Sequence, residues 1–196
     1  MSGDHRSAPA AAQVRHVEAL LEARGLLAPG EIDERIDALA AGGTPAHGAA
    51  LVARAWVDPA FRERLLADGN AAIAELGFSM GGALQEQKLT VVANDEDEHH
   101  VIVCTLCSCY PIALLGPSPG WYKSEAYRSR VVREPRAVLA GFGLELPAST
   151  RITVWDASAE SRYMVLPLRP EGTADVTEDE LAGLVTRKGL IGTAAV

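Results

Sequence analysis

Long hydrophobic runs are absent from this sequence. No window approaches the roughly 20 apolar residues that a membrane-spanning helix needs. The N-terminal stretch 1–9 also lacks the charged and then apolar pattern of an export signal. We therefore expect a cytoplasmic protein that does not associate with a membrane.

Lysine is scarce, and the 18 basic residues are outnumbered by 26 acidic ones, which gives a net charge of −8. A surface with this charge is a poor partner for a phosphate backbone, so we expect no nucleic-acid partner. Several arginines are nevertheless concentrated in one stretch of the chain. We expect them to form structural ion pairs and subunit contacts: Arg128, Arg130, Arg133 and Arg136.

The composition, 48% hydrophobic and 22% charged, is that of a globular chain of 196 residues with one sizeable core. Two stretches near the N-terminus, 14–25 and 31–41, carry apolar residues at helical spacing and end at glycines. They predict a helical arm spanning residues 1–44. Residues 45–196 then form the main domain.

The order of elements in the main domain predicts an α+β fold. Helical patterns cover the ranges 45–57, 60–67, 70–76, 121–132 and 134–142. A last short helix begins at the capping box of Thr177 and Glu180. The β-prone runs are 89–93, 101–103, 152–155 and 163–166, and the last two are expected to pair with each other. The proline-rich segment 104–120 is expected to be mostly loop.

Cysteine is also rare, and all three residues lie close together: Cys104, Cys107 and Cys109. A disulfide framework would be spread through the chain, so we interpret the cysteines as one site. Their spacing brings three sulfurs to one point only if the backbone curls tightly around them. The same curl draws the amides of Ser108 and Cys109 inward. We call residues 104–109 the claw.

The residue types alone leave alternatives open. Structural zinc prefers four ligands, usually from two separated pairs, and no second pair exists here. A thioredoxin-type redox pair would use Cys104 and Cys107 but would leave Cys109 unexplained. Metal binding is favoured, and the competing interpretation is a non-catalytic thiol-based metal or redox sensor.

The run Val-Cys-Thr-Leu-Cys-Ser-Cys-Tyr at 103–110 resembles the metal claw of cobalt-type nitrile hydratase alpha subunits. Iron-type relatives instead have serine in the place of Thr105. The resemblance continues in order through most of the chain, including 55–59, 121–123, 135–139, 154–156 and 163–167. It implies an N-terminal helical arm followed by a layered α-β-β-α catalytic domain, here residues 45–196.

The resemblance implies a non-corrin Co(III) ion, with iron less expected. Its ligands would be the sulfurs of Cys104, Cys107 and Cys109 and the main-chain nitrogens of Ser108 and Cys109, with one position left open. Cys107 would be oxidised to the sulfinic acid and Cys109 to the sulfenic acid. Soft thiolates and anionic amides stabilise a trivalent ion, which acts as a Lewis acid. The implied reaction is hydration of a nitrile to its amide.

The resemblance also implies a partner, a β subunit made of one chain or two. This subunit covers the site and supplies arginines that pair with the oxidised cysteines. The arginines of this chain between Arg128 and Arg136 are the local alternative for that pairing, although structural ion pairs and subunit contacts are favoured for them. We expect the two amphipathic helices of the arm to wrap this partner. Gln85, or Gln87 if the loop aligns differently, matches a pocket glutamine that hydrogen-bonds substrate or water. Cys109 and Gln85 are therefore the implied catalytic residues, and the attacking oxygen comes either from water or hydroxide at the site or from the Cys109 sulfenate.

One departure from the family concerns the substrate pocket. Many relatives have a tryptophan after Cys-Tyr-Pro, whereas this chain has Ile112, which leaves more room. We therefore expect a bulky heteroaromatic nitrile, such as the nucleoside antibiotic toyocamycin, which a three-subunit branch of the family hydrates. The closest rival is the metal-bearing subunit of thiocyanate hydrolase, for whose anionic substrate an arginine at position 112 would help.

Histidines and tryptophans near the claw are assigned structural roles. His99 and His100 precede the claw strand, but neither is needed to complete the ligand set. The three tryptophans are expected to pack in the core or at an interface: Trp56, Trp121 and Trp155.

Overall fold

The structure is a computed structural model that describes residues 8–81 and 87–196. The chain divides into two compact units, the first ending at Gly42 and the second beginning at Gly43. The first unit contains helices α1 (Ala8–Ala23) and α2 (Glu31–Ala41). Helix α2 has the predicted bounds, whereas α1 begins before the predicted start at residue 14. Within the described ranges, no helix has both the length and the apolar content to cross a bilayer.

The first unit leaves much of its apolar surface exposed. On α1, Val14, Val17 and Leu20 recur at three-residue intervals and are 66%, 53% and 41% exposed. Ile36 on α2 is 57% exposed. Contiguous exposed apolar side chains of this kind are typical of a surface that packs against another polypeptide.

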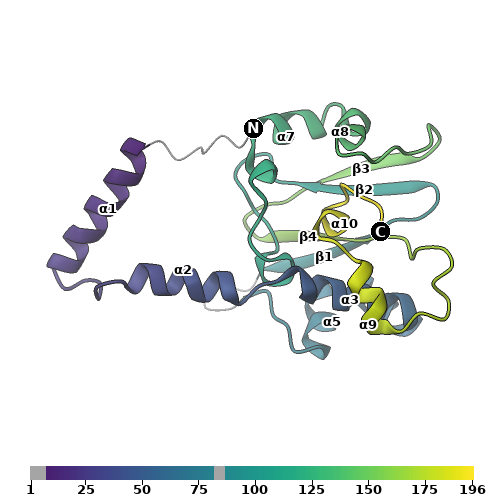
Figure 1. Ribbon diagram of the computed structural model, residues 1–196, viewed down its shortest axis with the longest axis horizontal. Coiled ribbons are helices and arrows are strands. Elements are labelled where there is room, and N and C mark those ends of the chain that lie inside the picture. The colour runs from purple at the N-terminus through teal and green to yellow at the C-terminus, as the bar shows by residue number, and fades with distance from the viewer. Residues whose placement is uncertain (1–7, 82–86) are drawn as a thin grey trace. The chain divides into compact units, whose positions relative to one another are not determined.

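The second unit contains helices on both sides of two pairs of strands (Figure 1). Its helices are α3 (Pro45–Val57), α4 (Pro59–Ala67), α5 (Gly69–Glu75), α6 (Ile112–Leu115), the 3₁₀ helix η1 (Gly120–Lys123), α7 (Glu125–Val131), α8 (Pro135–Gly141), α9 (Glu178–Leu184) and α10 (Arg187–Ile191). Its strands are β1 (Lys88–Ala93), β2 (Glu98–Val103), β3 (Arg151–Asp156) and β4 (Ser161–Leu166).

The strands pair in parallel, β1 with β4 and β2 with β3. The expected pairing of 152–155 with 163–166 is therefore wrong. The short connection between β3 and β4 would allow them to pair only as an antiparallel hairpin, since a parallel crossover needs a dozen or more residues. Each of the two strands instead pairs in parallel with a strand from an earlier part of the chain. The chain instead reverses after β3 and enters the other strand pair, and it does the same between β1 and β2.

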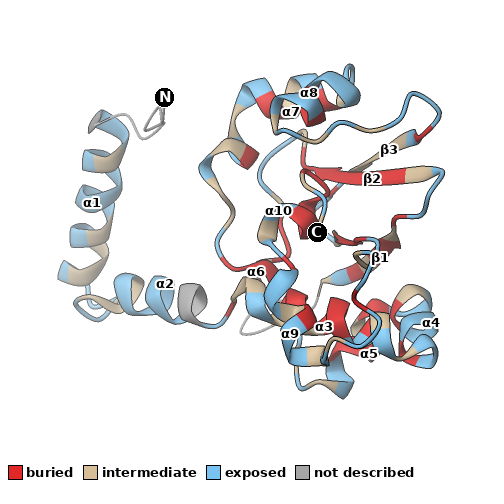
Figure 2. Cartoon of the chain, turned by 45° about the vertical axis from the view of Figure 1, so that its right-hand side comes forward, coloured by how far each residue is buried: buried red, intermediate tan, exposed pale blue. Residues whose placement is uncertain are grey.

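Helices α4 and α5 pack on β1, and α8 packs on β3, so helices flank the strands on two sides. The core between them is apolar and continuous, and β2 is buried along five of its six residues (Figure 2). The expected α+β fold with layered α-β-β-α order is confirmed. A hydrophobic strand buried on both faces is typical of parallel pairing under helices.

Side-chain caps explain where several helices begin. Asp58 accepts a hydrogen bond from the Phe61 amide at 3.0 Å and starts α4, and Thr177 and Glu180 form the expected capping box of α9. The single helix expected over 121–132 is wrong. Ser124 is extended and caps α7 through the Tyr127 amide, so η1 and α7 are separate.

Helix α10 was not anticipated from the sequence. Thr186 caps its first turn, and Gly192 ends it in a left-handed conformation with φ +85°. A β-carbon on Gly192 would lie 2.0 Å from the His100 carbonyl oxygen of β2. Only glycine allows this close approach of α10 to the strand that leads into the claw.

Candidate metal centre

The claw begins where β2 ends. Val103 is the last residue of β2, and it lies opposite Asp156, the last residue of β3. Because the two strands are parallel, their carboxyl ends meet at one edge, where open α/β sheets commonly bind ligands. Cys104 follows directly at this edge and is buried, whereas Cys107 is exposed and Cys109 is half-buried.

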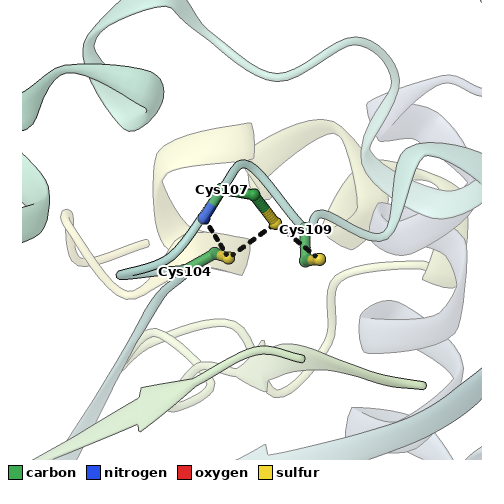
Figure 3. A group of neighbouring side chains, drawn as sticks. All are labelled: Cys104, Cys107 and Cys109. Carbon is green, nitrogen blue, oxygen red and sulfur yellow. Dashed lines mark hydrogen bonds between the residues drawn. The ribbon is translucent and has the colours of Figure 1, made fainter. Parts of the chain in front are cut away.

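The backbone of the claw brings the three sulfurs together, as the spacing predicts (Figure 3). The Sγ atoms of Cys104 and Cys107 are 3.3 Å apart, and those of Cys107 and Cys109 are 3.1 Å apart. All three lie within 4.8 Å of one another. The Cys107 amide also donates a hydrogen bond to the Cys104 sulfur at 3.3 Å.

The thiols of Cys107 and Cys109 have pKa values shifted in opposite directions. Hydrogen bonds from Cys109 and then Cys104 lower the pKa of Cys107 to about 7, and the backbone amides of Ser108 and Cys109 act in the same direction. Burial raises the pKa of Cys109 to about 12, and its hydrogen bond to Cys107 adds to this effect. The metal-free claw therefore concentrates charge on Cys107, the thiolate that its neighbours stabilise.

Side chains from outside the claw hold its backbone. Asp156 accepts hydrogen bonds from the Thr105 amide at 2.9 Å and from the Thr105 hydroxyl at 2.5 Å. The Tyr122 hydroxyl donates to the Cys109 carbonyl at 3.0 Å. Arg128 donates to two further claw carbonyls. The curl is thus fixed by contacts with β3, η1 and α7.

The arginine stretch has more varied roles than expected. Arg130 forms an ion pair with Glu134 at 2.8 Å, in line with the expectation. Arg136 instead donates to the backbone carbonyls of Leu146, Pro147 and Thr150. Arg128 likewise contacts carbonyls and not a carboxylate. A guanidinium has five N–H donors, so it can bind several carbonyl oxygens of a loop at once instead of one carboxylate.

The remaining site residues named from the sequence are placed as follows. Gln85 lies outside the described residues. Gln87 is described, and its backbone carbonyl accepts a hydrogen bond from Asn70 at 2.9 Å. Ser108 is exposed between Cys107 and Cys109. Ile112 is half-buried at the first position of α6 and packs against the hydrophobic core.

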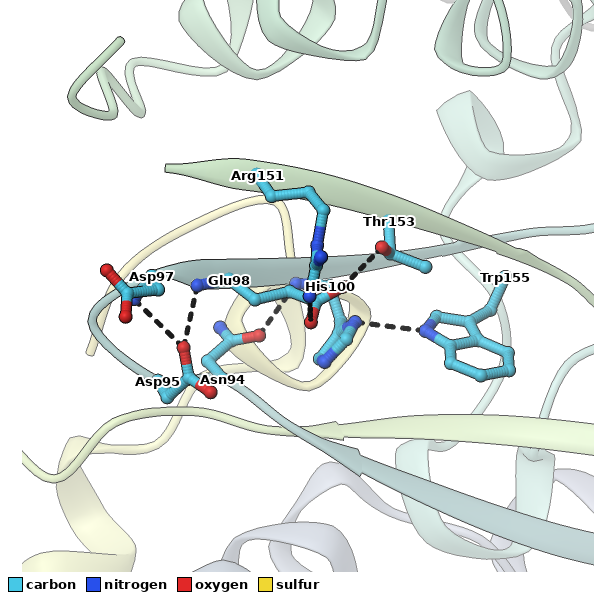
Figure 4. A network of polar contacts seen from close by, with 8 residues as sticks. All are labelled: Asn94, Asp95, Asp97, Glu98, His100, Arg151, Thr153 and Trp155. Atoms are coloured by element: carbon cyan, nitrogen blue, oxygen red, sulfur yellow. Dashed lines mark hydrogen bonds and ion pairs between the residues drawn. The ribbon is translucent and has the colours of Figure 1, made fainter. Parts of the chain in front are cut away.

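His99 and His100 do not precede the claw strand but lie within β2, where both are buried in a polar network. The His99 ring lies 2.8 Å from the Gly192 carbonyl and 3.1 Å from the Asn94 amide nitrogen. The Trp155 indole donates to His100 Nδ1 at 3.1 Å (Figure 4). These contacts tie β2 to α10 and β3, which is a structural role.

The other tryptophans also pack. The Trp56 indole donates to the Pro167 carbonyl at 2.9 Å, which joins α3 to the end of β4. Trp121 lies among the rings of Tyr122, Tyr127 and Phe142. Packing in this aromatic cluster holds η1 and α7 in place, and from these elements Tyr122 and Arg128 contact the claw.

Sequence reasoning missed Asp156 and Tyr122 as supports of the claw. Asp156 is 51 positions from Thr105, and only the register of β2 with β3 brings them together. The signal available in the sequence was a polar residue at the end of a β-prone run. That signal becomes informative only once the parallel pairing is known.

The donor set fits a thiophilic transition-metal ion. Three soft sulfur atoms converge, and the backbone amides of Ser108 and Cys109 lower the pKa of the Cys107 thiol. Sulfur donors favour thiophilic transition metals over Mg²⁺ or Ca²⁺, which prefer oxygen. The claw thus has the chemistry that the implied cobalt or iron ion requires.

Comparisons with known proteins bear on this site. A family model described as the nitrile hydratase alpha chain matches residues 8–194. The low-molecular weight cobalt-containing nitrile hydratase subunit alpha of Rhodococcus rhodochrous is 48% identical over 182 residues, or 93% of this chain and 86% of that protein. The thiocyanate hydrolase subunit gamma of Thiobacillus thioparus is 47% identical over 158 residues, or 76% of this chain and 65% of that one.

A solved structure shares the fold. A double mutant of the Fe-type nitrile hydratase from Comamonas testosteroni Ni1 matches with a TM-score of 0.88 and 43% identity, over 97% of this chain and 91% of that chain. The sequence match extends through both the arm and the main domain. This chain therefore belongs to the nitrile hydratase alpha chain family.

Proposed function

We propose that this chain is the metal-bearing alpha subunit of a nitrile hydratase, which adds water to a nitrile and forms the amide. The observation that carries the proposal is the convergence of three cysteine sulfurs within 4.8 Å at the carboxyl end of β2. The cobalt-containing relative from Rhodococcus rhodochrous, 48% identical, supports it. So does the match to the family model over nearly the whole chain.

The proposed ligands are the sulfurs of Cys104, Cys107 and Cys109 and the main-chain nitrogens of Ser108 and Cys109. We include oxidation of Cys107 to the sulfinic acid and of Cys109 to the sulfenic acid in the proposal. When bound, a Co(III) ion supplies Lewis acidity toward the nitrile. Cys104 is buried and Cys109 is half-buried. The attacking oxygen is proposed to come either from water or hydroxide at the site or from the Cys109 sulfenate.

Cobalt is proposed over iron because Thr105 is the residue typical of cobalt-type claws. The cobalt-containing relative supports this choice, while the Fe-type structure shows that the fold also serves iron. Metal analysis of protein expressed with both ions available distinguishes the two.

A β subunit is the proposed partner. Cys107 is exposed and Leu106 at the claw tip is 89% exposed, so the single chain leaves its reactive sulfur open to water. A covering chain would exclude that water and bring arginines to the oxidised cysteines. We further propose that the arm, residues 1–44, contacts this partner through the exposed face of Val14, Val17 and Leu20.

The proposed substrate is a bulky heteroaromatic nitrile, because Ile112 occupies the place of a pocket tryptophan in many relatives. Gln85 is proposed to hydrogen-bond the substrate or a water molecule. Replacing Ile112 by tryptophan should shift the preference toward small aliphatic nitriles. A wild-type protein that prefers acetonitrile-sized substrates to a nucleoside nitrile would refute this part of the proposal.

Thiocyanate hydrolysis is the second candidate, favoured by the 47% identity to a thiocyanate hydrolase gamma subunit. Its substrate is a small anion, and the neutral side chain of Ile112 offers that anion no charge. Direct assay with thiocyanate separates the two reactions. Turnover of thiocyanate without amide formation from any nitrile would replace the first candidate by the second.

The test is co-expression with the partner genes in cobalt-supplemented medium. The purified assembly should contain stoichiometric cobalt and form amide, and the claw peptide should gain the mass of three oxygen atoms. Cys109→Ser should abolish turnover. A protein that contains no metal, but whose thiols oxidise reversibly, would instead be a sensor.

A further inference from the structure

Arg128 joins α7 to the claw through hydrogen bonds to two backbone carbonyls. From α7, its Nη1 donates to the Thr105 carbonyl at 3.2 Å and to the Cys107 carbonyl at 3.3 Å. Both acceptors lie in the claw, more than twenty positions earlier in the chain. A single guanidinium nitrogen therefore binds two carbonyl oxygens of the claw.

The charge of Arg128 is directed to the claw alone. Among residues 8–81 and 87–196, no carboxylate forms an ion pair with it, in contrast to Arg130 two positions later. Its Nε is buried and makes no hydrogen bond with any described residue. The guanidinium is partly buried, and its described hydrogen bonds go to claw carbonyls, so its contribution is made to the shape of the claw.

The Cys107 carbonyl belongs to the peptide bond that also contains the Ser108 nitrogen. In a trans peptide the carbonyl and the amide hydrogen point in opposite directions, and the described residues contain no cis peptide bond. Because the Cys107 carbonyl accepts a hydrogen bond from Arg128, the Ser108 amide hydrogen points away from the guanidinium.

We propose that Arg128 is a positioning residue that fixes the peptide plane between Cys107 and Ser108, so that the Ser108 nitrogen faces the three sulfurs. The consequence for metal binding rests on the proposed function, in which this nitrogen is a ligand. Without Arg128 the peptide is free to turn its carbonyl inward. An amide oxygen is a harder donor than the nitrogen and suits a thiophilic ion less well.

The test compares Arg128→Met and Arg128→Lys with Arg130→Gln as a matched control on the same helix. Each variant is co-expressed with the partner subunit in cobalt-supplemented medium and purified as the assembly. Cobalt content is measured per chain, X-ray absorption reports the nitrogen and sulfur ligands, and thermal unfolding reports stability. We expect Arg128→Met to lose at least fivefold in cobalt content and to lose a nitrogen ligand in the loaded fraction. Arg130→Gln should match wild type in both.

The Lys variant keeps a cationic donor, so it should retain the nitrogen ligand, although it lacks the planar fork of arginine. If Arg128→Met fails to assemble, Arg128→Lys decides: a retained nitrogen ligand supports the proposal, and its loss overturns it. Full cobalt content with an unchanged ligand set in Arg128→Met also overturns it. So does an equal loss in Arg130→Gln.

A metal-independent measurement separates this proposal from the proposed function. A crystal structure of metal-free Arg128→Met should show the peptide between Cys107 and Ser108 rotated relative to wild type, and an unchanged orientation refutes the positioning role. Conversely, a wild-type assembly that hydrates no nitrile refutes the proposed function. In that case a rotated peptide in the variant still supports the role of Arg128.

Discussion

The carboxylate of Asp156 accepts hydrogen bonds from both the backbone amide and the hydroxyl of Thr105. Asp156 ends β3, and Thr105 is the second residue after β2, so this contact follows from the parallel register of the two strands. It fixes the amide and the hydroxyl of Thr105, while Arg128 holds the carbonyl of the same residue and that of Cys107. The residue typical of cobalt-type claws is thus the one that β3 holds.

Replacing Asp156 by asparagine should weaken this hold. The site requires two acceptor oxygens, and an asparagine amide offers one, with a donor group where the second should be. Asp156 is exposed, so water replaces part of the loss, and we expect a cost of about 1 kcal/mol and a Tm lower by a few degrees. Thermal unfolding of the assembled protein measures it.

Thr105 provides the matched controls. Thr105→Ser keeps both donors, so its Tm should equal that of wild type. Thr105→Val loses only the hydroxyl donor, so its Tm should lie between those of wild type and Asp156→Asn. Wild-type stability and cobalt content in Asp156→Asn would show that the contact has no role in forming the claw.

Acid stability should depend on Glu98 at the start of β2. Hydrogen bonds from Arg151 and Thr153 lower the pKa of Glu98 to about 2 (Figure 4). Because the folded-state pKa lies below the unfolded value of about 4.3, the stabilisation is present above that value and is lost as the pH falls toward 2. Glu98→Gln should flatten the unfolding profile in this window. An identical acid profile in the variant would contradict the assignment.

His99 should make the fold sensitive to mild acid. Burial lowers its pKa, and its ring already accepts from Asn94 while donating to the Gly192 carbonyl. Since the folded-state pKa lies below the unfolded value of about 6.5, stability is full above that pH and declines as the pH falls below it. Protonation would set an N–H against the Asn94 amide, whose oxygen already accepts from the His100 amide at 2.8 Å.

The check is the pH dependence of urea unfolding between pH 5 and pH 8, values chosen to span roughly the ordinary range of histidine titration. His99→Gln cannot titrate, so its stability should change less over this range than that of wild type. Equal slopes for the two proteins would remove His99 from the explanation.

Gly192 and Gly143 form a matched pair for testing the close approach of α10 to β2. Both have positive φ, +85° and +88°, but a β-carbon at Gly192 meets the His100 carbonyl at 2.0 Å, whereas at Gly143 nothing lies within 4 Å. Alanine at position 143 should cost about 1 kcal/mol from backbone strain alone. Alanine at 192 must also displace backbone and should cost several times more or prevent assembly. Equal costs would show that the contact relaxes easily.

Much of the helical structure was predictable because its signals are local. Asp58, Thr177 and the apolar spacing of the N-terminal helices act within a few residues of one another, and each begins or shapes a helix where expected. Strand pairing was not predictable in the same way. The short turn between β3 and β4 favours a hairpin by local rules, but burial of both faces of β2 selects β3 as its parallel partner.

The chemistry of the claw follows from the order of amino acids, because three cysteines within six residues carry their donor atoms wherever the chain places them. The groups that hold the claw backbone in its curled shape are known only from the folded arrangement of the chain. These groups belong to Asp156, Tyr122 and Arg128, which lie well outside the claw in the sequence. Their contacts with the claw depend on strand register and helix packing, which no local sequence pattern specifies.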